Sequence, residues 1–168
     1  MHILIKNKYL ILKDYRIKCA VGKRGIGKKT KEGDYITPVG SFKIKLILYR
    51  KDKIKKLHTS LKKKAIKENM GWCNDPASNR YNELVVLPNK FSHEKLYRKD
   101  NLYDIIMVLN YNMNPVRKNK GSAIFVHVAK RKFKSTEGCI AIQKSELLKI
   151  VKNVRLNTNL SNKNINNI

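Results

Sequence analysis

The stretch that decides the fold is HILIKNKYLILKDYRIKCAV, residues 2–21. Apolar and β-branched residues cluster there in three short runs separated by polar turns, which is typical of strands. Turns this short join antiparallel neighbours, so we expect a β-meander at the start of the chain. The expected strands cover residues 3–5, 9–12 and 15–21, with turns at 6–8 and 13–14.

Further apolar runs follow along the chain and predict a mostly β fold with a minor α component. Runs of four to eight apolar residues bounded by polar or turn-forming residues are typical of buried strands. Glycines between residues 22 and 40 predict a loop before the next strand. The further expected strands cover residues 42–49, 84–87, 105–109 and 123–128.

Helical patterns are scarce. The best helix covers residues 145–151, with Ser145 as its N-cap. Residues 53–68 predict a short basic helix, whereas Gly, Pro and Asn at 70–82 predict a long loop. The chain of 168 residues is large enough for one domain that buries about 70% of its unfolded surface. We expect that domain at 1–152 and a disordered, Asn-rich tail at 153–168.

A cysteine and a histidine stand close together near the C-terminal end of the expected sheet. Cys139 follows His127 by twelve positions, and the strand run that ends at His127 is short. A cysteine attacks carbonyl carbon as the thiolate, and an imidazole can take its proton. Gly138 permits a sharp turn that aims the N–H groups of Gly138 and Cys139 at an oxyanion. The pattern predicts Cys139 as nucleophile with a lowered pKa and His127 as base; the alternative is a structural cysteine beside a core histidine.

Three separated motifs support a catalytic interpretation of Cys139 and His127. Residues 136–139 with His127 resemble the active-site signature of the L,D-transpeptidase (YkuD-like) catalytic domain family, a histidine, a spacer and Ser/Thr-x-Gly-Cys. Residues 22–27 and 37–40 are similar to its glycine-rich stretch and Thr-Pro-x-Gly. The resemblance runs from about residue 15 to about residue 150, and one branch of the family is also similar at residues 71–76, 81–82, 92–94 and 102–104.

Two positions depart from the family pattern. Ala141 stands where many members carry Arg, and Glu137 stands where many carry His. We therefore transfer no substrate contacts from other branches. Since a carboxylate beside a thiol disfavours the thiolate, we expect the Glu137 side chain to point away from Cys139.

The resemblance implies a β-sandwich or barrel-like domain that acts on peptidoglycan stem peptides. It implies that Cys139 attacks the carbonyl between the L and D centres of a donor stem and forms a thioester. An amine acceptor from a second stem then gives a cross-link, whereas water gives L,D-carboxypeptidase or amidase-type hydrolysis. This chemistry needs no metal and no organic cofactor. A cysteine peptidase acting on L,L-peptides is a rival that would keep the Cys/His pair without the glycine-rich segments.

Four further side chains near the motifs are candidates for substrate contact. Hydroxyls near a strand end or turn can bind substrate or cap the turn, and a loop histidine can orient substrate or simply be solvated. The candidates are Ser122, Ser135, Thr136 and His93.

The cysteine count leaves at least one thiol unpaired. The three cysteines show no metal-ligand spacing. Cys19 lies on the apolar face of its expected strand and is expected to be buried and unreactive. Cys73 lies in the expected loop and is expected to be intermediate in reactivity.

A net charge of +26 permits a different class of function, a non-enzymatic domain that binds polyanions. Residues 50–56 and 62–64 are the basic stretches suited to phosphate contact. The excess is lysine rather than arginine, and no nucleic-acid-binding module is visible, so we expect a solvated surface and no specific nucleic acid. Attraction to an acidic cell-wall polymer is a third interpretation.

The location is predicted from two features that disagree. The resemblance implies the cell envelope or periplasm, yet residues 1–8 form a poor signal peptide, so a cytoplasmic location is the alternative. No apolar run reaches the ~20 residues of a membrane span. We expect a monomer.

Overall fold

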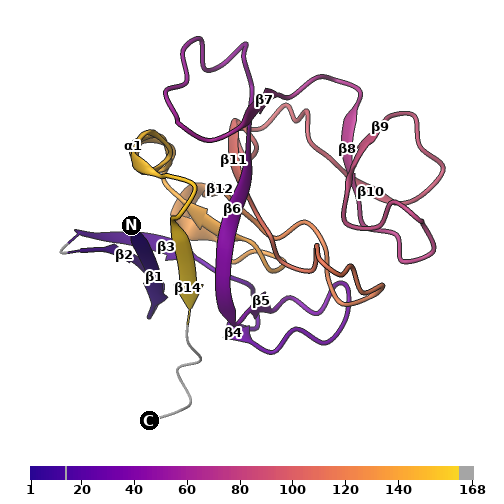
Figure 1. Cartoon of the computed structure of the whole chain (residues 1–168), viewed down its shortest axis with the longest axis horizontal. Helices are drawn as coiled ribbons and strands as arrows, with labels where there is room; N and C mark the ends of the chain where they lie inside the picture. The colour runs from indigo at the N-terminus through magenta and orange to yellow at the C-terminus, as the bar shows by residue number, and fades with distance from the viewer. Residues whose placement is uncertain (14, 163–168) are drawn as a thin grey trace.

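The computed structural model describes residues 1–13 and 15–162, and within them a nine-stranded sheet closes on itself (Figure 1). The N-terminal meander is as expected. Its strands, β1 (His2–Lys6), β2 (Tyr9–Leu12) and β3 (Tyr15–Ala20), pair antiparallel. Alternation along β1 buries Ile3 and Ile5 completely. The second expected turn, at 13–14, lies partly outside the described residues.

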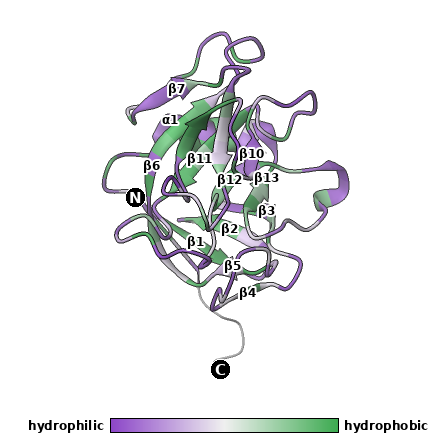
Figure 2. Ribbon diagram, turned by 90° about the vertical axis from the view of Figure 1, so that its right-hand side faces the viewer, coloured by the Kyte–Doolittle hydropathy of each residue, from purple (hydrophilic) through white to green (hydrophobic). Residues whose placement is uncertain are grey.

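The sheet closes through its longest strand, β6 (Gly40–Tyr49). The first half of β6 pairs with β14 (Asn159–Asn162), and its second half pairs with β11 (Ile105–Leu109) and with the short β7 (Lys63–Ala65). A mostly β, barrel-like fold is therefore confirmed. Figure 2 shows the apolar strands gathered inside the molecule and hydrophilic loops outside.

Between β11 and β3 the sheet runs through two parallel strands that position the site. These are β12 (Phe125–Val128) and β13 (Ile140–Ile142), which pair with Val126 opposite Ile140 and His127 opposite Ala141. This register sets Cys139, immediately before β13, beside Phe125. The parallel pairing of β12 and β13 thus places His127, in β12, and Cys139, just before β13, on neighbouring parts of the sheet.

A small second sheet packs against the main one. It consists of β8 (Met70–Cys73), β9 (Leu84–Val86) and β10 (His93–Lys95), with β8 in the middle. Trp72 is buried and meets Phe125 edge to face, with ring centroids 5.2 Å apart. The expected loop at 70–82 is therefore wrong for β8, whose four residues are all buried.

The expected basic helix at 53–68 is wrong. Its apolar residues Ile54, Leu57 and Leu61 have helical spacing, and all three are buried in the main core. The segment that carries these three residues is a loop. It begins with a single turn, in which the N–H groups of residues 53 and 54 donate to the Arg50 carbonyl. Residues 63–65 of the same segment form β7, which pairs with β6 instead.

The prediction of a disordered tail from residue 153 is wrong as far as Asn162. β14 lies between β1 and β6, where Leu160 is completely buried. The Asn162 amide donates to the Pro38 carbonyl at 3.0 Å and accepts the Gly40 N–H at 2.8 Å. The asparagine-rich composition predicted disorder. β14 is instead paired with β1 on one side and β6 on the other, and this pairing satisfies its backbone hydrogen bonds. Residues 163–168 lie outside the described part.

The expected C-terminal helix is present as α1 (Lys144–Asn153). The N-cap of α1 is Gln143, whose side chain makes no capping hydrogen bond. The prediction of Ser145 as N-cap is therefore wrong, because Ser145 lies in the first turn of the helix. No helix in the described ranges is long and apolar enough to cross a membrane. The remaining short elements are β4 (Ile26–Gly27), β5 (Thr37–Pro38) and a 3₁₀ helix at Arg131–Phe133.

Candidate active site

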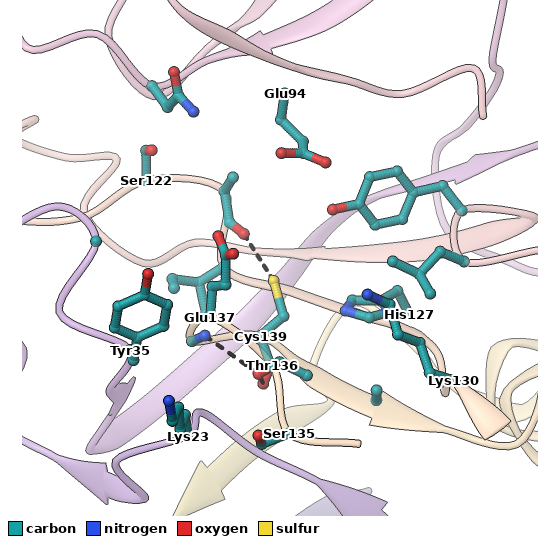
Figure 3. A pocket seen from close by; sticks show the side chains of 18 of the residues that line it. Lys23, Tyr35, Glu94, Ser122, His127, Lys130, Ser135, Thr136, Glu137 and Cys139 are labelled. Carbon is teal, nitrogen blue, oxygen red and sulfur yellow. Dashed lines mark hydrogen bonds between the residues drawn. The ribbon is translucent and has the colours of Figure 1, made fainter. Parts of the chain in front are cut away.

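A cavity opens where the starts of β12 and β13 meet the glycine-rich loop and the small sheet (Figure 3). Cys139 and His127 both line it. The glycine-rich loop supplies lysines to its wall, and β10 supplies Glu94. The three sequence motifs, which are far apart along the chain, therefore converge on one cavity.

The Cys139 thiol is held between two backbone groups. It donates to the Ala123 carbonyl at 3.0 Å and accepts the Phe125 N–H at 3.4 Å. Burial raises the pKa of the thiol to about 12, the Phe125 N–H opposes this, and the charge of Glu94 adds to it. The expectation of a lowered Cys139 pKa is therefore wrong, and the thiol is neutral in this structure.

The His127 side chain is buried and stands in a defined tautomer. Its Nδ1 lies 2.8 Å from the Val128 carbonyl, and a carbonyl only accepts, so Nδ1 carries the proton. Burial lowers the pKa of His127 to about 4, and Tyr103 packs edge-on against the ring at 5.4 Å. The imidazole is neutral at physiological pH, and its Nε2 has a free lone pair to accept a proton.

A tight turn leads into Cys139. The Thr136 hydroxyl donates to the Cys139 carbonyl at 2.6 Å and accepts the Gly138 N–H at 3.2 Å. Gly138 has a φ of +143°, and a Cβ there would lie 3.0 Å from the Ile36 carbonyl oxygen, so the turn requires glycine. Thr136 caps this turn, and the Gly138 N–H, which we predict to face an oxyanion, already has a partner in this state.

The Thr-Pro-x-Gly motif contacts the same turn. The Thr37 hydroxyl accepts the Gly22 N–H at 2.8 Å and donates to the Cys139 carbonyl at 3.4 Å. Thr37 is completely buried. The motif therefore connects the glycine-rich loop to the backbone of the predicted nucleophile.

A buried ion pair braces the glycine-rich loop. Lys29 Nζ lies 2.5 Å from Asp34 Oδ1, and both side chains are at most 2% exposed. Asp34 also accepts the N–H groups of Thr30 and Ile36. Burial alone would raise the pKa of Asp34, but the hydrogen bonds from Lys29 and the backbone lower it to about 2.

The other predicted contact residues divide into two groups. Ser122, Ser135 and Thr136 line the cavity. His93 does not; its Nδ1 lies 2.8 Å from the Phe91 carbonyl, so the structure gives no support to His93 as a substrate contact. The expected orientation of Glu137 is wrong, because it lines the cavity with Cys139 and its charge contributes to the raised pKa of the thiol.

Two further features of the site were not predicted: the hydrogen bonds of the buried Asn82 and the charged side chains that line the cavity. Asn82 Oδ1 accepts from Trp72 Nε1 and from the Ala123 N–H, both at 3.0 Å, so this buried amide holds the segment that faces the sulfur. Glu94 stands beside His93 in the segment 92–94, and only Glu94 lines the cavity, because neighbouring residues of a strand point to opposite faces. Arg98, Lys23, Lys130 and Lys134 also line the cavity.

Comparison with known proteins agrees with this architecture. A search of curated proteins finds no match. The sequence model of the YkuD family, described as the L,D-transpeptidase catalytic domain, matches residues 3–161, which spans both the meander and β14. The chain therefore belongs to the YkuD L,D-transpeptidase catalytic domain family.

Proposed function

We propose that this protein transfers acyl groups on peptidoglycan stem peptides through a Cys139 thioester, and so cross-links or remodels the cell wall at the cell envelope. The observation that carries the proposal is the presence of a neutral thiol and a neutral imidazole with a free Nε2 on one cavity. Family membership supports the reaction class.

The first half-reaction forms the thioester. The thiol proton passes to His127 Nε2 as sulfur bonds to the carbonyl carbon between the L and D centres. The carbon–nitrogen bond of the tetrahedral intermediate then breaks. His127 gives its proton to the leaving amine, and the terminal D-residue departs. Because the free thiol has a raised pKa, we expect proton transfer to accompany attack rather than precede it.

The second half-reaction resolves the thioester. An unprotonated amine of a second stem attacks the same carbon, and its surplus proton passes to His127. The carbon–sulfur bond breaks, and sulfur takes that proton, which restores the thiol. Water in place of the amine gives a free acid, so the hydrolytic alternative uses the same residues.

The test is incubation with purified stem peptides, with products read by mass. Wild type is expected to show an acyl-enzyme on Cys139, to release the terminal D-residue and to yield dimers or trimmed stems. Cys139→Ala should abolish all three, whereas Cys73→Ala, at a buried cysteine outside the cavity, serves as the matched control.

Two outcomes would redirect the proposal. Cleavage of L,L-peptides with no action on L,D bonds would indicate an ordinary cysteine peptidase. Absence of any acyl-enzyme on a folded wild type would leave the polyanion-binding interpretation.

A further inference from the structure

Three lysines of the cavity wall have ammonium groups without a partner. Lys23, Lys130 and Lys134 line the cavity and are exposed. The lysines whose side chains form hydrogen bonds or ion pairs within the described ranges are Lys29, Lys53, Lys63, Lys120, Lys144 and Lys149. The three cavity lysines are not among them, so their charges are available to a ligand that enters the cavity.

The proposed reaction brings a carboxylate to the His127 side of the cavity. His127 gives its proton to the leaving amine of the terminal D-residue, and the free carboxylate of that residue is ionised at neutral pH. In an α-amino acid two bonds separate the nitrogen from the carboxyl carbon, which holds the two atoms about 2.5 Å apart. The terminal carboxylate must therefore lie beside the imidazole, where a negative charge removed from water needs a compensating partner.

Lys130 is an unpaired lysine on that side of the cavity. It follows His127 by three positions, just beyond the end of β12. Figure 3 shows Lys130 on the same side of the Cys139 sulfur as His127, with Lys23 on the other side. Burial is the first cause of the low pKa of His127, and the charges of Lys130 and Arg98 add to it. The Lys130 ammonium is therefore close enough to act on the imidazole and on a group bound beside it.

The other charged groups on that side are engaged with one another. Arg98 donates to both oxygens of Asp100, at 2.9 and 2.8 Å, and contacts Glu94 at 3.3 Å. Asp100 therefore has its cation in Arg98, and Arg98 already serves two carboxylates. The Glu137 carboxylate lies on the far side of the sulfur from Lys130 in Figure 3. Lys130 is the cation left for a carboxylate that arrives with the substrate.

We propose that Lys130 binds the terminal carboxylate of the donor stem and so favours stems that end one residue beyond the bond that is cleaved. A lysine ammonium has three donors and one positive charge, and its hydrogen bonds to a carboxylate are charge-assisted. The inference rests on the proposed function and names the donor specificity of the same site. Lys130 is a specificity-determining residue, and Cys139 and His127 keep their roles in the acyl transfer.

The first test compares two donor stems in thioester formation, one with a free terminal carboxylate and one with a terminal amide. Wild type should prefer the carboxylate about tenfold or more in kcat/KM, the range expected for a charge-assisted hydrogen bond. Lys130→Met keeps the length of the side chain and should lose most of this preference, whereas Lys130→Arg should retain it. Lys132→Met makes the same change at an exposed lysine outside the cavity and should keep the wild-type preference.

Three outcomes of this comparison would overturn the subsite. If Lys130→Met slows both donors equally, the lysine acts through the imidazole and not on the carboxylate. If Lys23→Met or Lys134→Met removes the preference while Lys130→Met keeps it, the carboxylate lies elsewhere in the cavity. A third donor, amidated only on a side-chain carboxylate, tests the source of the charge. Its rate relative to the unmodified stem should be the same in wild type and Lys130→Met, and a change would mean that Lys130 reads the side chain instead.

A binding measurement separates this inference from the proposed function. Calorimetry on Cys139→Ala should show tighter binding of the stem with a free terminal carboxylate than of its terminal amide, and Cys139→Ala/Lys130→Met should lose the difference. Discrimination between these two stems without any wild-type acyl-enzyme would refute the proposed function alone. An acyl-enzyme that forms equally fast from both stems would refute the subsite alone.

Discussion

At the scale of single residues, burial decides the protonation of the two predicted catalytic groups. With the pKa of Cys139 at about 12, alkylation by iodoacetamide should accelerate about tenfold per pH unit from pH 7 to 9, since only the thiolate reacts. The histidine pKa of about 4 predicts no inflection near pH 6.5. Peptide mapping should find Cys139 labelled before the buried Cys19 and Cys73. A rate plateau at neutral pH would instead indicate a thiolate–imidazolium pair.

His127 should matter for acyl transfer far more than for alkylation. A carbapenem, which the family membership suggests as a mimic of the acyl donor, should add its mass to Cys139 alone. His127→Ala should slow this acylation by about 10²–10⁴-fold, the contribution of a positioned acid–base group. Intact-protein mass spectrometry over time measures the rate. Equal rates in wild type and His127→Ala would remove His127 from the mechanism.

At the scale of elements, the buried pair of Lys29 and Asp34 holds the glycine-rich loop against the cysteine turn. Asp34→Asn leaves the Lys29 ammonium buried without its counter-charge and should lower the free energy of unfolding by about 3–5 kcal/mol, read from urea denaturation. Glu83→Gln breaks an exposed pair with Arg80 and should cost less than about 1 kcal/mol. Similar losses in both variants would mean that the loop tolerates the unpaired lysine.

The Lys29–Asp34 ion pair should make the free energy of unfolding decrease as the pH falls. The pKa of Asp34 is lowered to about 2 in the folded state, against about 3.9 in the unfolded chain. Its contribution is therefore present above about pH 4 and is lost as pH falls toward 2. Urea titrations of wild type and Asp34→Asn at pH 5, 3.5 and 2.5 should show a difference between them that shrinks with acidity. A difference that stays constant would contradict the assignment.

At the scale of the whole molecule, the lysines of the two predicted basic stretches, 50–56 and 62–64, lie mainly on solvated loops and on the edge strand β7. Lys51, Lys55 and Lys56 are exposed, as are Lys62, Lys63 and Lys64. Binding to nucleic acid should therefore be weak, indifferent to sequence, and reduced by orders of magnitude between ~50 and 200 mM salt. Fluorescence anisotropy with unrelated oligonucleotides measures it. Tight, selective binding at physiological salt would favour the polyanion-binding function.

The sequence by itself determined the elements whose signals are local. Alternation with short polar turns predicted β1, β2 and β3, and continuous apolar runs predicted β6 and β11. Local motifs predicted Cys139 and His127 as nucleophile and base, and both side chains line one cavity. The strand β13, which follows Cys139 and pairs with β12, was not among the predicted elements.

Only the tertiary structure decided features that depend on distant partners. β14 is ordered because β1 and β6 satisfy its backbone from both sides, and residues 54–61 follow a loop because their apolar side chains reach the core without a helix. The small sheet places Glu94 rather than His93 on the cavity, since pairing with β8 sets which face each residue occupies. Burial keeps both Cys139 and His127 neutral, because a charge removed from water is destabilised unless a partner compensates it, and composition does not reveal which groups lose their water.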